Sequence, residues 1–251
     1  MPRHNIAMRI AVVSDIHGNL TAFEAVLADV RQMSPDLILH GGDLADAGSS
    51  PVEVVDRIRG LGWPGVYGNT DEMLFAPDTL DSFALGVPGM KPIFAMIREM
   101  AEWTRVALGE ERLAWLRTLP GMQSQGGLAL VHASPTTAWR APDQKASDED
   151  LRSTFERLGC ATVAYGHIHR SYVRELEGLT VVNAGSVNLS YDGDPRASYL
   201  LLDNGVPAIR RVAYDVEREA RALTECGQPH ADWVARMMKA GSFQMPGKDQ
   251  K

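Results

Sequence analysis

A chain of 251 residues with 45% hydrophobic content is long enough to bury a sizeable core, and we expect one or two domains. A formal charge of −7 argues against general nucleic-acid binding and against binding to a membrane surface, because both need a basic face. A small phosphorylated substrate stays possible, since bound metal ions reverse the sign of the charge locally.

Cysteine usage and the N-terminal residues point to an intracellular setting. The two cysteines, Cys160 and Cys226, form no CxxC pair, which argues against a thiolate zinc site and a disulfide framework. The first nine residues include charged side chains, and no apolar run approaches membrane-spanning length. We therefore expect a cytoplasmic protein.

The N-terminal part alternates short apolar runs with helical patterns. Residues 8–14, 36–40 and 65–67 are predicted strands. Between them, S/T-x-x-E sequences that begin at Thr21 and Ser50 predict capping boxes at the starts of two helices. Alternation of strand and helix is typical of a largely parallel sheet, whose ligand sites lie at the carboxyl ends of the strands.

Residues 72–119 interrupt this alternation with prolines and glycines. Helical stretches are expected near 94–104 and 110–119. We interpret the segment as a helical insertion beside the site. Two roles remain open for it: a lid that helps to select the substrate, or a segment that only packs over the core.

The strand pattern then resumes at residues 128–131 and 162–165. A helix is expected between them, with Ser147 as its N-cap and Gly159 as its stop.

The last part of the chain predicts a second, more antiparallel sheet. Strands are expected at 172–176, 180–182, 198–203 and 206–213, with Asn204-Gly205 as a hairpin turn. We expect one domain over residues 1–251, in which residues 217–251 form a C-terminal helical extension and a polar tail.

Aspartate, asparagine and histidine recur where the predicted strands end. The seven residues are Asp15, His17, Asp43, Asn69, His132, His167 and His169. A mixed set of imidazole and oxygen ligands suits Mn, Fe, Zn or Co better than Mg or Ca. Seven ligands are too many for one ion with an open position, and suit two ions that share a carboxylate. Two aspartates and two divalent ions leave a net positive pocket that would bind a phosphate.

The order of these motifs resembles the calcineurin-like metallophosphoesterase superfamily. The matching motifs are Asp15-x-His17-Gly18-Asn19, Gly42-Asp43, Gly68-Asn69-x-Asp71, His132 and Gly166-His167-x-His169, within residues 8 to roughly 203. Residues 130–135 and 183–187 are similar to the small bacterial and archaeal phosphodiesterase-like branch. The resemblance implies an α/β fold, a four-layer α/β/β/α sandwich in which helices flank two mixed β-sheets.

The resemblance also implies a role for each ligand. Asp15, His17, Asp43 and His169 would hold one ion, and Asp43, Asn69, His132 and His167 the other. Asp43 would be the bridge, and Asp43, Asn69 and His132 are the expected catalytic residues. The implied reaction is hydrolysis of a phosphodiester or a nucleotide phosphoanhydride by a metal-bound hydroxide. A phosphomonoesterase, a non-catalytic metal-binding scaffold and a slow nucleotide sensor are the alternatives, and the intact ligand set favours an enzyme.

One position departs from the family pattern. Many members carry histidine directly after the metal-ligating asparagine, where this chain has Thr70. A threonine hydroxyl is a poor general acid at neutral pH, so substrates with good leaving groups are expected. Asp46 matches an acidic position that orients this histidine in some relatives, and we expect a structural role for it. For Asp71, support of a ligand and capping of a helix remain open.

Three residues are candidate contacts for a small phosphorylated substrate such as a nucleotide: Asn19, Thr70 and Arg196. Asn19 either caps a helix or touches the phosphate, and the cap is favoured. Arg196 either binds the anion or forms a salt bridge within a hairpin, and the salt bridge is favoured. His40 is expected to be a hydrogen-bonded core histidine, and Trp139 is a packing residue close to the His132 loop.

Overall fold

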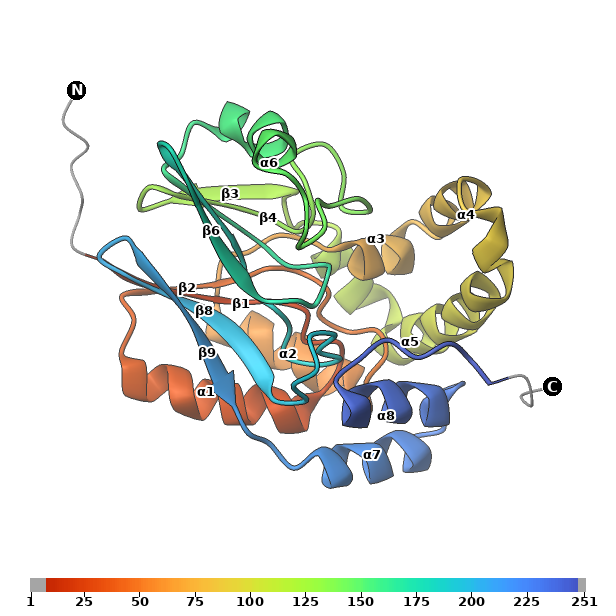
Figure 1. The fold of residues 1–251 in the computed structure, drawn as a ribbon. Helices are drawn as coiled ribbons and strands as arrows, with labels where there is room; N and C mark the ends of the chain where they lie inside the picture. The colour runs from red at the N-terminus through yellow and green to blue at the C-terminus, as the bar shows by residue number, and fades with distance from the viewer. Residues whose placement is uncertain (1–7, 248–251) are drawn as a thin grey trace.

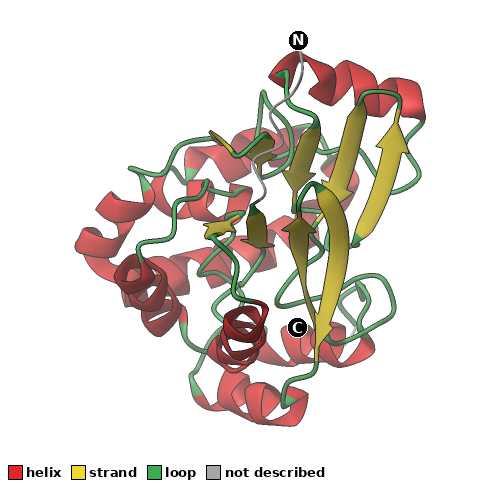
Figure 2. Ribbon diagram, turned by 90° about the vertical axis from the view of Figure 1, so that its left-hand side faces the viewer, coloured by secondary structure: helices red, strands yellow, loops and turns green. Residues whose placement is uncertain are grey.

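Two β-sheets form the centre of the computed structural model, which describes residues 8–247 (Figures 1 and 2). The first sheet has the strand order β2 (Leu37–His40), β1 (Arg9–Val13), β8 (Ala197–Asp203), β9 (Val206–Val212). The second has the order β3 (Met122–Gln125), β4 (Leu128–Val131), β5 (Thr162–Tyr165), β7 (Leu179–Asn183), β6 (Tyr172–Leu176). Both are mixed, because parallel pairs (β1 with β2, and β4 and β7 with β5) adjoin antiparallel ones.

The alternation of side chains along β1 explains the layers. Ile10 and Val12 belong to a buried cluster with Leu128 and Leu130 of the second sheet, so one face of β1 packs against the other sheet. The opposite face contributes to a separate cluster that includes residues of α1 (Leu20–Met33) and α2 (Pro51–Leu61).

Helices cover both outer faces. In Figure 1, α1 and α2 lie on one side of the two sheets and α6 (Asp148–Phe155) on the other. A third buried cluster joins Leu151 and Phe155 of α6 to β4, β5 and β7. The architecture is therefore the expected four-layer sandwich of helices, two mixed sheets and helices.

The remaining helices lie beside the sandwich. They are α3 (Asn69–Phe75), α4 (Asp78–Leu85), the 3₁₀ turn η1 (Pro88–Met90), α5 (Lys91–Leu116), the 3₁₀ turn η2 (Glu156–Leu158), α7 (Val216–Glu225) and α8 (Ala231–Ala240). A non-helical residue, Gly109 (φ 65°, ψ 170°), divides α5 into two helical pieces. The first piece shares a buried cluster with α7 and α8, so the insertion and the C-terminal extension meet in space.

Several local predictions were wrong. Residues 65–67 form only an isolated bridge from Gly65 to His40, and β3 was not expected. Thr21 is not a cap, because α1 begins at Leu20. Ser50 is in the N-cap position of α2, but its side chain makes no capping hydrogen bond. By contrast, Ser147 caps α6 and forms a reciprocal capping box with Asp150.

No single helix among residues 8–247 has the length and apolar composition needed to cross a membrane. The sequence from α4 through α5 passes that test only as a pair of helices bent by 119°.

Candidate metal centre

The seven predicted ligands all lie near the carboxyl ends of strands or at the start of α3. Asp15 and His17 follow β1, Asp43 follows β2, and the remaining histidines follow β4 and β5. Five of the seven have left-handed backbones: Asp15 (φ 56°), His17 (φ 47°), Asp43 (φ 54°), His167 (φ 66°) and His169 (φ 54°). Each such conformation costs about 1–2 kcal/mol for a residue other than glycine. Strain of this kind gathers at functional sites.

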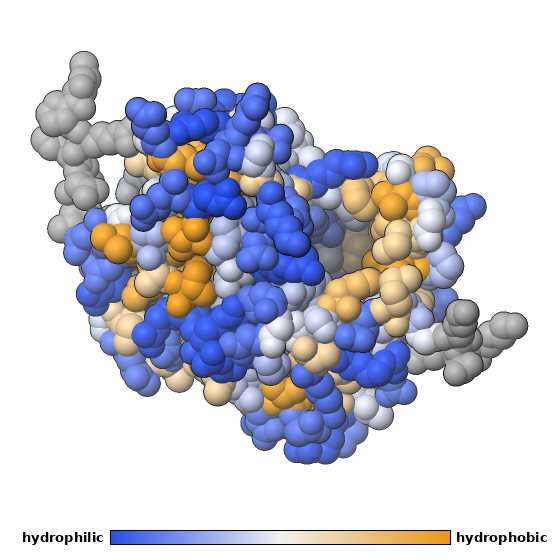
Figure 3. All heavy atoms as spheres, viewed as in Figure 1, coloured by the Kyte–Doolittle hydropathy of each residue, from blue (hydrophilic) through white to orange (hydrophobic). Residues whose placement is uncertain are grey.

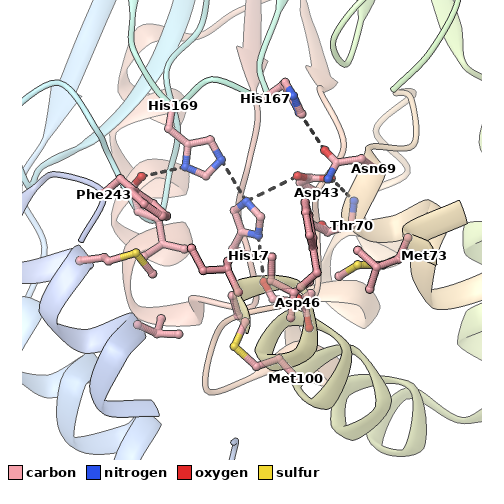
Figure 4. Close-up of a pocket in the computed structure, with 18 of the residues that line it drawn as sticks. His17, Asp43, Asp46, Asn69, Thr70, Met73, Met100, His167, His169 and Phe243 are labelled. Atoms are coloured by element: carbon pink, nitrogen blue, oxygen red, sulfur yellow. Dashed lines mark hydrogen bonds and ion pairs between the residues drawn. The ribbon is translucent and has the colours of Figure 1, made fainter. Parts of the chain in front are cut away.

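The first group of side chains is fully buried and compact. Ligand atoms of Asp15, His17, Asp43 and His169 all lie within 4.8 Å of one another. His169 Nε2 is 3.2 Å from Asp15 Oδ1 and 3.2 Å from His17 Nε2, and His17 Nε2 is 3.6 Å from Asp43 Oδ2. Figure 4 shows the His17 and His169 rings facing each other beside Asp43.

The second group adjoins the first through Asp43. Asn69 Oδ1 lies 3.1 Å from His132 Nε2 and 2.8 Å from His167 Nδ1. His132 Nε2 is in turn 3.4 Å from Asp43 Oδ2, the same oxygen that faces His17. This single carboxylate oxygen is positioned between the two groups.

Backbone carbonyls determine which ring nitrogen carries the proton in three histidines. His17 Nδ1 donates to Asp46 O at 2.9 Å, His132 Nδ1 to Gly41 O at 2.8 Å, and His169 Nδ1 to Leu189 O at 2.7 Å. A carbonyl oxygen only accepts, so each neutral ring presents an unprotonated Nε2 to the centre.

This arrangement requires positive charge at the centre. Unprotonated nitrogens and carboxylate oxygens repel one another unless a cation lies between them. Without a metal, a proton takes that place: burial opposes charge on His132, but the Asp43 carboxylate prevails and raises its pKa to about 10. Imidazole, carboxylate and amide donors, five of the seven buried and several held by outer hydrogen bonds, fit a divalent transition metal.

Asp71 supports the Asp43 loop and the start of α3. Its carboxylate accepts hydrogen bonds from the backbone N–H groups of Asp43 (2.7 Å), Leu44 (2.9 Å) and Gly68 (2.9 Å). The Thr70 N–H donates to Asp43 Oδ1 at 2.9 Å. Asp71 therefore supports the ligand loop. It is not the N-cap of α3, which is Gly68, but from the third helical position its carboxylate accepts from the Gly68 N–H.

Two glycines make room for the carboxylates. A Cβ at Gly68 would lie 2.0 Å from Asp43 Oδ1, and one at Gly166 would lie 2.2 Å from Asp15 Oδ2. The glycines that precede Asn69 and His167 are thus required by close approach to the ligands.

The predicted substrate contacts lie in different places. Asn19 is buried, caps α1 by accepting from Ala22 N at 2.8 Å, and donates to Asn188 Oδ1 at 3.1 Å. Arg196 forms an ion pair with Asp194 at 2.6 Å, half-exposed. Thr70 alone of the three lines the pocket beside the centre.

Asp46 and His40 have distinct surroundings. Asp46 Oδ1 accepts from Thr104 Oγ1 at 2.8 Å, which ties the Asp43 loop to α5, and burial raises the pKa of Asp46 to about 7.

The prediction of a hydrogen-bonded His40 was wrong. Its ring is fully buried near Gly65 and Trp115, and neither nitrogen has a partner among residues 8–247.

Sequence reasoning missed Tyr191 and underrated Trp139. The Tyr191 ring stacks on His169 with centroids 4.8 Å apart and an angle of 16°. Trp139 Nε1 donates to Glu72 Oε2 at 2.6 Å, which ties the loop after His132 to α3, and the ring lines the pocket. No local signal marks Tyr191, because its contact with His169 depends on how distant loops meet.

Fold and site together define an α/β protein of four layers with a candidate metal centre at its strand ends. The chain belongs to the calcineurin-like phosphoesterase superfamily, whose domain model matches residues 8–205.

Proteins similar to this chain include one metallophosphoesterase of solved structure and two proteins named for phosphoester or phosphoanhydride hydrolysis. A metallophosphoesterase from Sphaerobacter thermophilus superposes with a TM-score of 0.77 at 28% identity, over 94% of this chain and 99% of that one. A symmetrical bis(5'-nucleosyl)-tetraphosphatase of Methylococcus capsulatus is 34% identical over 153 residues, 59% of this chain and 51% of that protein. The phosphodiesterase YfcE of Escherichia coli is 24% identical over 212 residues, 80% and 91% of the two chains.

Proposed function

We propose that this protein hydrolyses a phosphodiester or a nucleotide phosphoanhydride with two divalent ions. The observation that carries the proposal is Asp43 Oδ2, which lies 3.6 Å from His17 Nε2 and 3.4 Å from His132 Nε2. One oxygen between two sets of unprotonated nitrogens suits a carboxylate shared by two metal ions. Asp15, His17, Asp43 and His169 would hold the first ion, and Asp43, Asn69, His132 and His167 the second.

Bound Mn, Fe, Zn or Co ions would polarise the phosphate and supply an activated water. The protein's own part is to hold these groups in place. Asp71 and the backbone carbonyls orient the ligands. Two divalent ions would bring about four positive charges, of which the two aspartates neutralise about two, so the site would keep a positive charge that attracts a phosphate.

Thr70 is a poor proton donor for the leaving group. Thr70 stands where an acid would protonate it, and its hydroxyl has no hydrogen-bond partner among residues 8–247. A substrate whose leaving group departs as a stable anion suits this site, which favours activated diesters and anhydrides over alkyl monoesters.

The names of the relatives support both substrate types, since one is a phosphodiesterase and another a tetraphosphatase. A phosphomonoesterase, a metal-binding scaffold and a nucleotide sensor are the competing functions. The complete set of ligands, five of the seven buried, favours catalysis over the last two.

Metal-dependent turnover of bis(4-nitrophenyl) phosphate tests the proposal. Protein stripped with a chelator is reloaded with Mn or Zn, its metal content is measured, and the rate is followed by nitrophenolate release. We expect activity that rises with metal content to two ions per chain, and much slower release of phosphate from glycerol phosphate. Protein with two bound ions that hydrolyses neither compound would remove the enzyme proposal.

A further inference from the structure

A cavity of about 280 Å³ opens directly onto the candidate metal centre. Its inner wall consists of ligand side chains, among them His17, Asp43 and His169. Figure 4 shows these residues on one side of the space and Met73, Met100 and Phe243 around it. A phosphate held at the centre would therefore have room for one of its substituents in this cavity.

The outer walls are apolar and come from segments far apart in the chain. They include Phe83 of α4, Phe94 and Ile97 of α5, Trp233 and Met237 of α8, and Phe243. Figure 3 shows apolar surface gathered over α4 and α5 beside a hollow on this face of the molecule. The insertion and the C-terminal extension thus enclose one space, which supports a substrate-selecting role for residues 72–119.

The charge of the cavity argues against a polyphosphate substrate. No lysine or arginine within residues 8–247 lines it, and its carboxylates belong to Asp43 and Asp46. Bound ions would neutralise one phosphate at the centre. A second or third phosphate in the cavity would lie against rings and methyl groups with no countercharge, and burying an unpaired charge is very costly.

We propose that this cavity binds an uncharged apolar substituent, an aryl or short alkyl group, of the phosphoester that is cleaved. The substrate class is then a phosphodiester with an apolar organic group, and nucleoside polyphosphates are excluded. The proposal rests on the proposed function for its reaction, and on the cavity wall for its specificity. The volume is close to the lower end of known small-ligand pockets, near 300 Å³, which suits one such group.

A homologous series of alkyl 4-nitrophenyl phosphates, from methyl to hexyl, isolates this specificity. The leaving group is constant, so kcat/KM reports how well the alkyl group is bound. Each buried methylene contributes about 0.8 kcal/mol, so we expect about a fourfold rise per carbon over the first few members. Diadenosine tetraphosphate should be turned over at least about a hundredfold less efficiently than the best alkyl ester.

A pair of variants on α5 locates the effect in the cavity. Ile97→Asn places an amide in the wall and should flatten the rise to less than about twofold per carbon. Val106→Asn on the same helix makes the matched change at a position that is 74% exposed and does not line the cavity. Val106→Asn should retain the wild-type series.

Equilibrium binding provides a readout independent of turnover. Trp139 and Trp233 line the cavity, so tryptophan emission should report the binding of hexylphosphonate and methylphosphonate to metal-loaded protein. We expect hexylphosphonate to bind at least about tenfold more tightly to wild-type protein, and the advantage to disappear in Ile97→Asn.

The possible failures are distinguishable. Metal-dependent turnover in which a flat alkyl series accompanies equal affinities for the two phosphonates, equal phosphonate binding by the two variants, or preference for the tetraphosphate would overturn the specificity and leave the phosphoesterase intact. A flat series with tighter binding of hexylphosphonate would instead mean that the 4-nitrophenyl ring itself occupies the cavity. Absence of turnover with two ions bound would overturn the proposed function. The ratio of the two phosphonate affinities would then still decide the nature of the cavity, since equal affinities contradict it.

Discussion

The metal centre and the cavity beside it share side chains but are built in different ways. Six of the seven centre residues lie in the loops that follow strands, five have left-handed backbones, and three of the histidines have a ring nitrogen bonded to a backbone carbonyl. The cavity wall comes from α4, α5, α8 and Phe243, and consists of rings and aliphatic chains in van der Waals contact. At the centre, hydrogen bonds and backbone conformation fix the position of each ligand side chain. In the cavity wall, by contrast, the main requirement is that the side chains are apolar and fill the available volume.

This difference predicts different tolerance to change. Small changes at the centre should weaken metal binding at least about tenfold, because coordination geometry admits little displacement. Changes in the wall that preserve apolarity and volume should alter substrate preference and leave metal content unchanged. The following experiments test the first region in order of decreasing expected effect.

Asp43→Asn should have the largest effect, because it removes the charge that both ligand groups face. We expect loss of at least one bound ion and a fall in kcat/KM on the order of a thousandfold, equivalent to about 4 kcal/mol. Metal analysis and the nitrophenyl assay measure both quantities. Asp148→Asn, an exposed carboxylate on α6, is the control. A variant that retains two ions would contradict the bridging role.

Gly166→Ala should come next, because the new Cβ would lie 2.2 Å from Asp15 Oδ2 and from Ser14 Oγ. Displacement of Asp15 should weaken metal binding about 10–100-fold. Gly60→Ala in α2 is the matched control, since its Cβ would meet no atom of residues 8–247 within 4 Å and alanine should stabilise the helix by about 1 kcal/mol. Titration with metal compares them, and equal affinities would show that the close approach at Gly166 is unimportant.

Asp71→Asn should have a smaller effect, because the residue supports Asp43 without facing the metal ions. The amide can still accept through its oxygen but loses the second acceptor, and at least one of three N–H groups loses its partner. We expect about a tenfold loss in metal affinity. Wild-type affinity together with wild-type thermal stability would indicate that the loop is held by other contacts.

His40 lies at the end of β2 but outside the ligand set, and its buried ring should make the free energy of unfolding depend on pH. Burial lowers its pKa from 6.5 to about 4, so the unfolded chain binds more protons between these values. Stability should therefore rise with pH across that window, by up to about 3 kcal/mol from this residue. Urea unfolding of metal-free His40→Leu at pH 4.5 and 7 should show this dependence removed and metal-loaded activity nearly unchanged. An unaltered pH dependence would mean that the His40 ring takes up its proton equally in the folded and the unfolded chain.

The positions of most strands could be predicted from local pattern, but their division between the sheets could not. The prediction that the last four strands form a second sheet was wrong, because β8 and β9 join β1 in the first sheet and only β6 and β7 lie in the other. The runs that became β1, β2, β4 and β5 are apolar and lie inside the protein, so burial itself produced the signal. The polar edge strand β3 has no such signal, because pairing with β4 and not burial places it in the sheet. At the start of α1 the sequence offers both Asn19 and Thr21 as N-caps. The structure has Asn19 as the N-cap, and the same side chain also donates a hydrogen bond to Asn188.

The sequence by itself determined the strand ends, the types of ligand that follow them and their order, because short-range chemistry controls these features. The tertiary structure alone decided which atoms meet. It placed Asp43 Oδ2 between His17 and His132, directed Asp71 to three backbone amides, and left the His40 ring without a hydrogen-bond partner in the described part of the chain. It also assembled the apolar cavity from helices more than a hundred residues apart, such as α5 and α8. Contacts of that range depend on the packing of whole layers, for which no local stretch of the chain carries a signal.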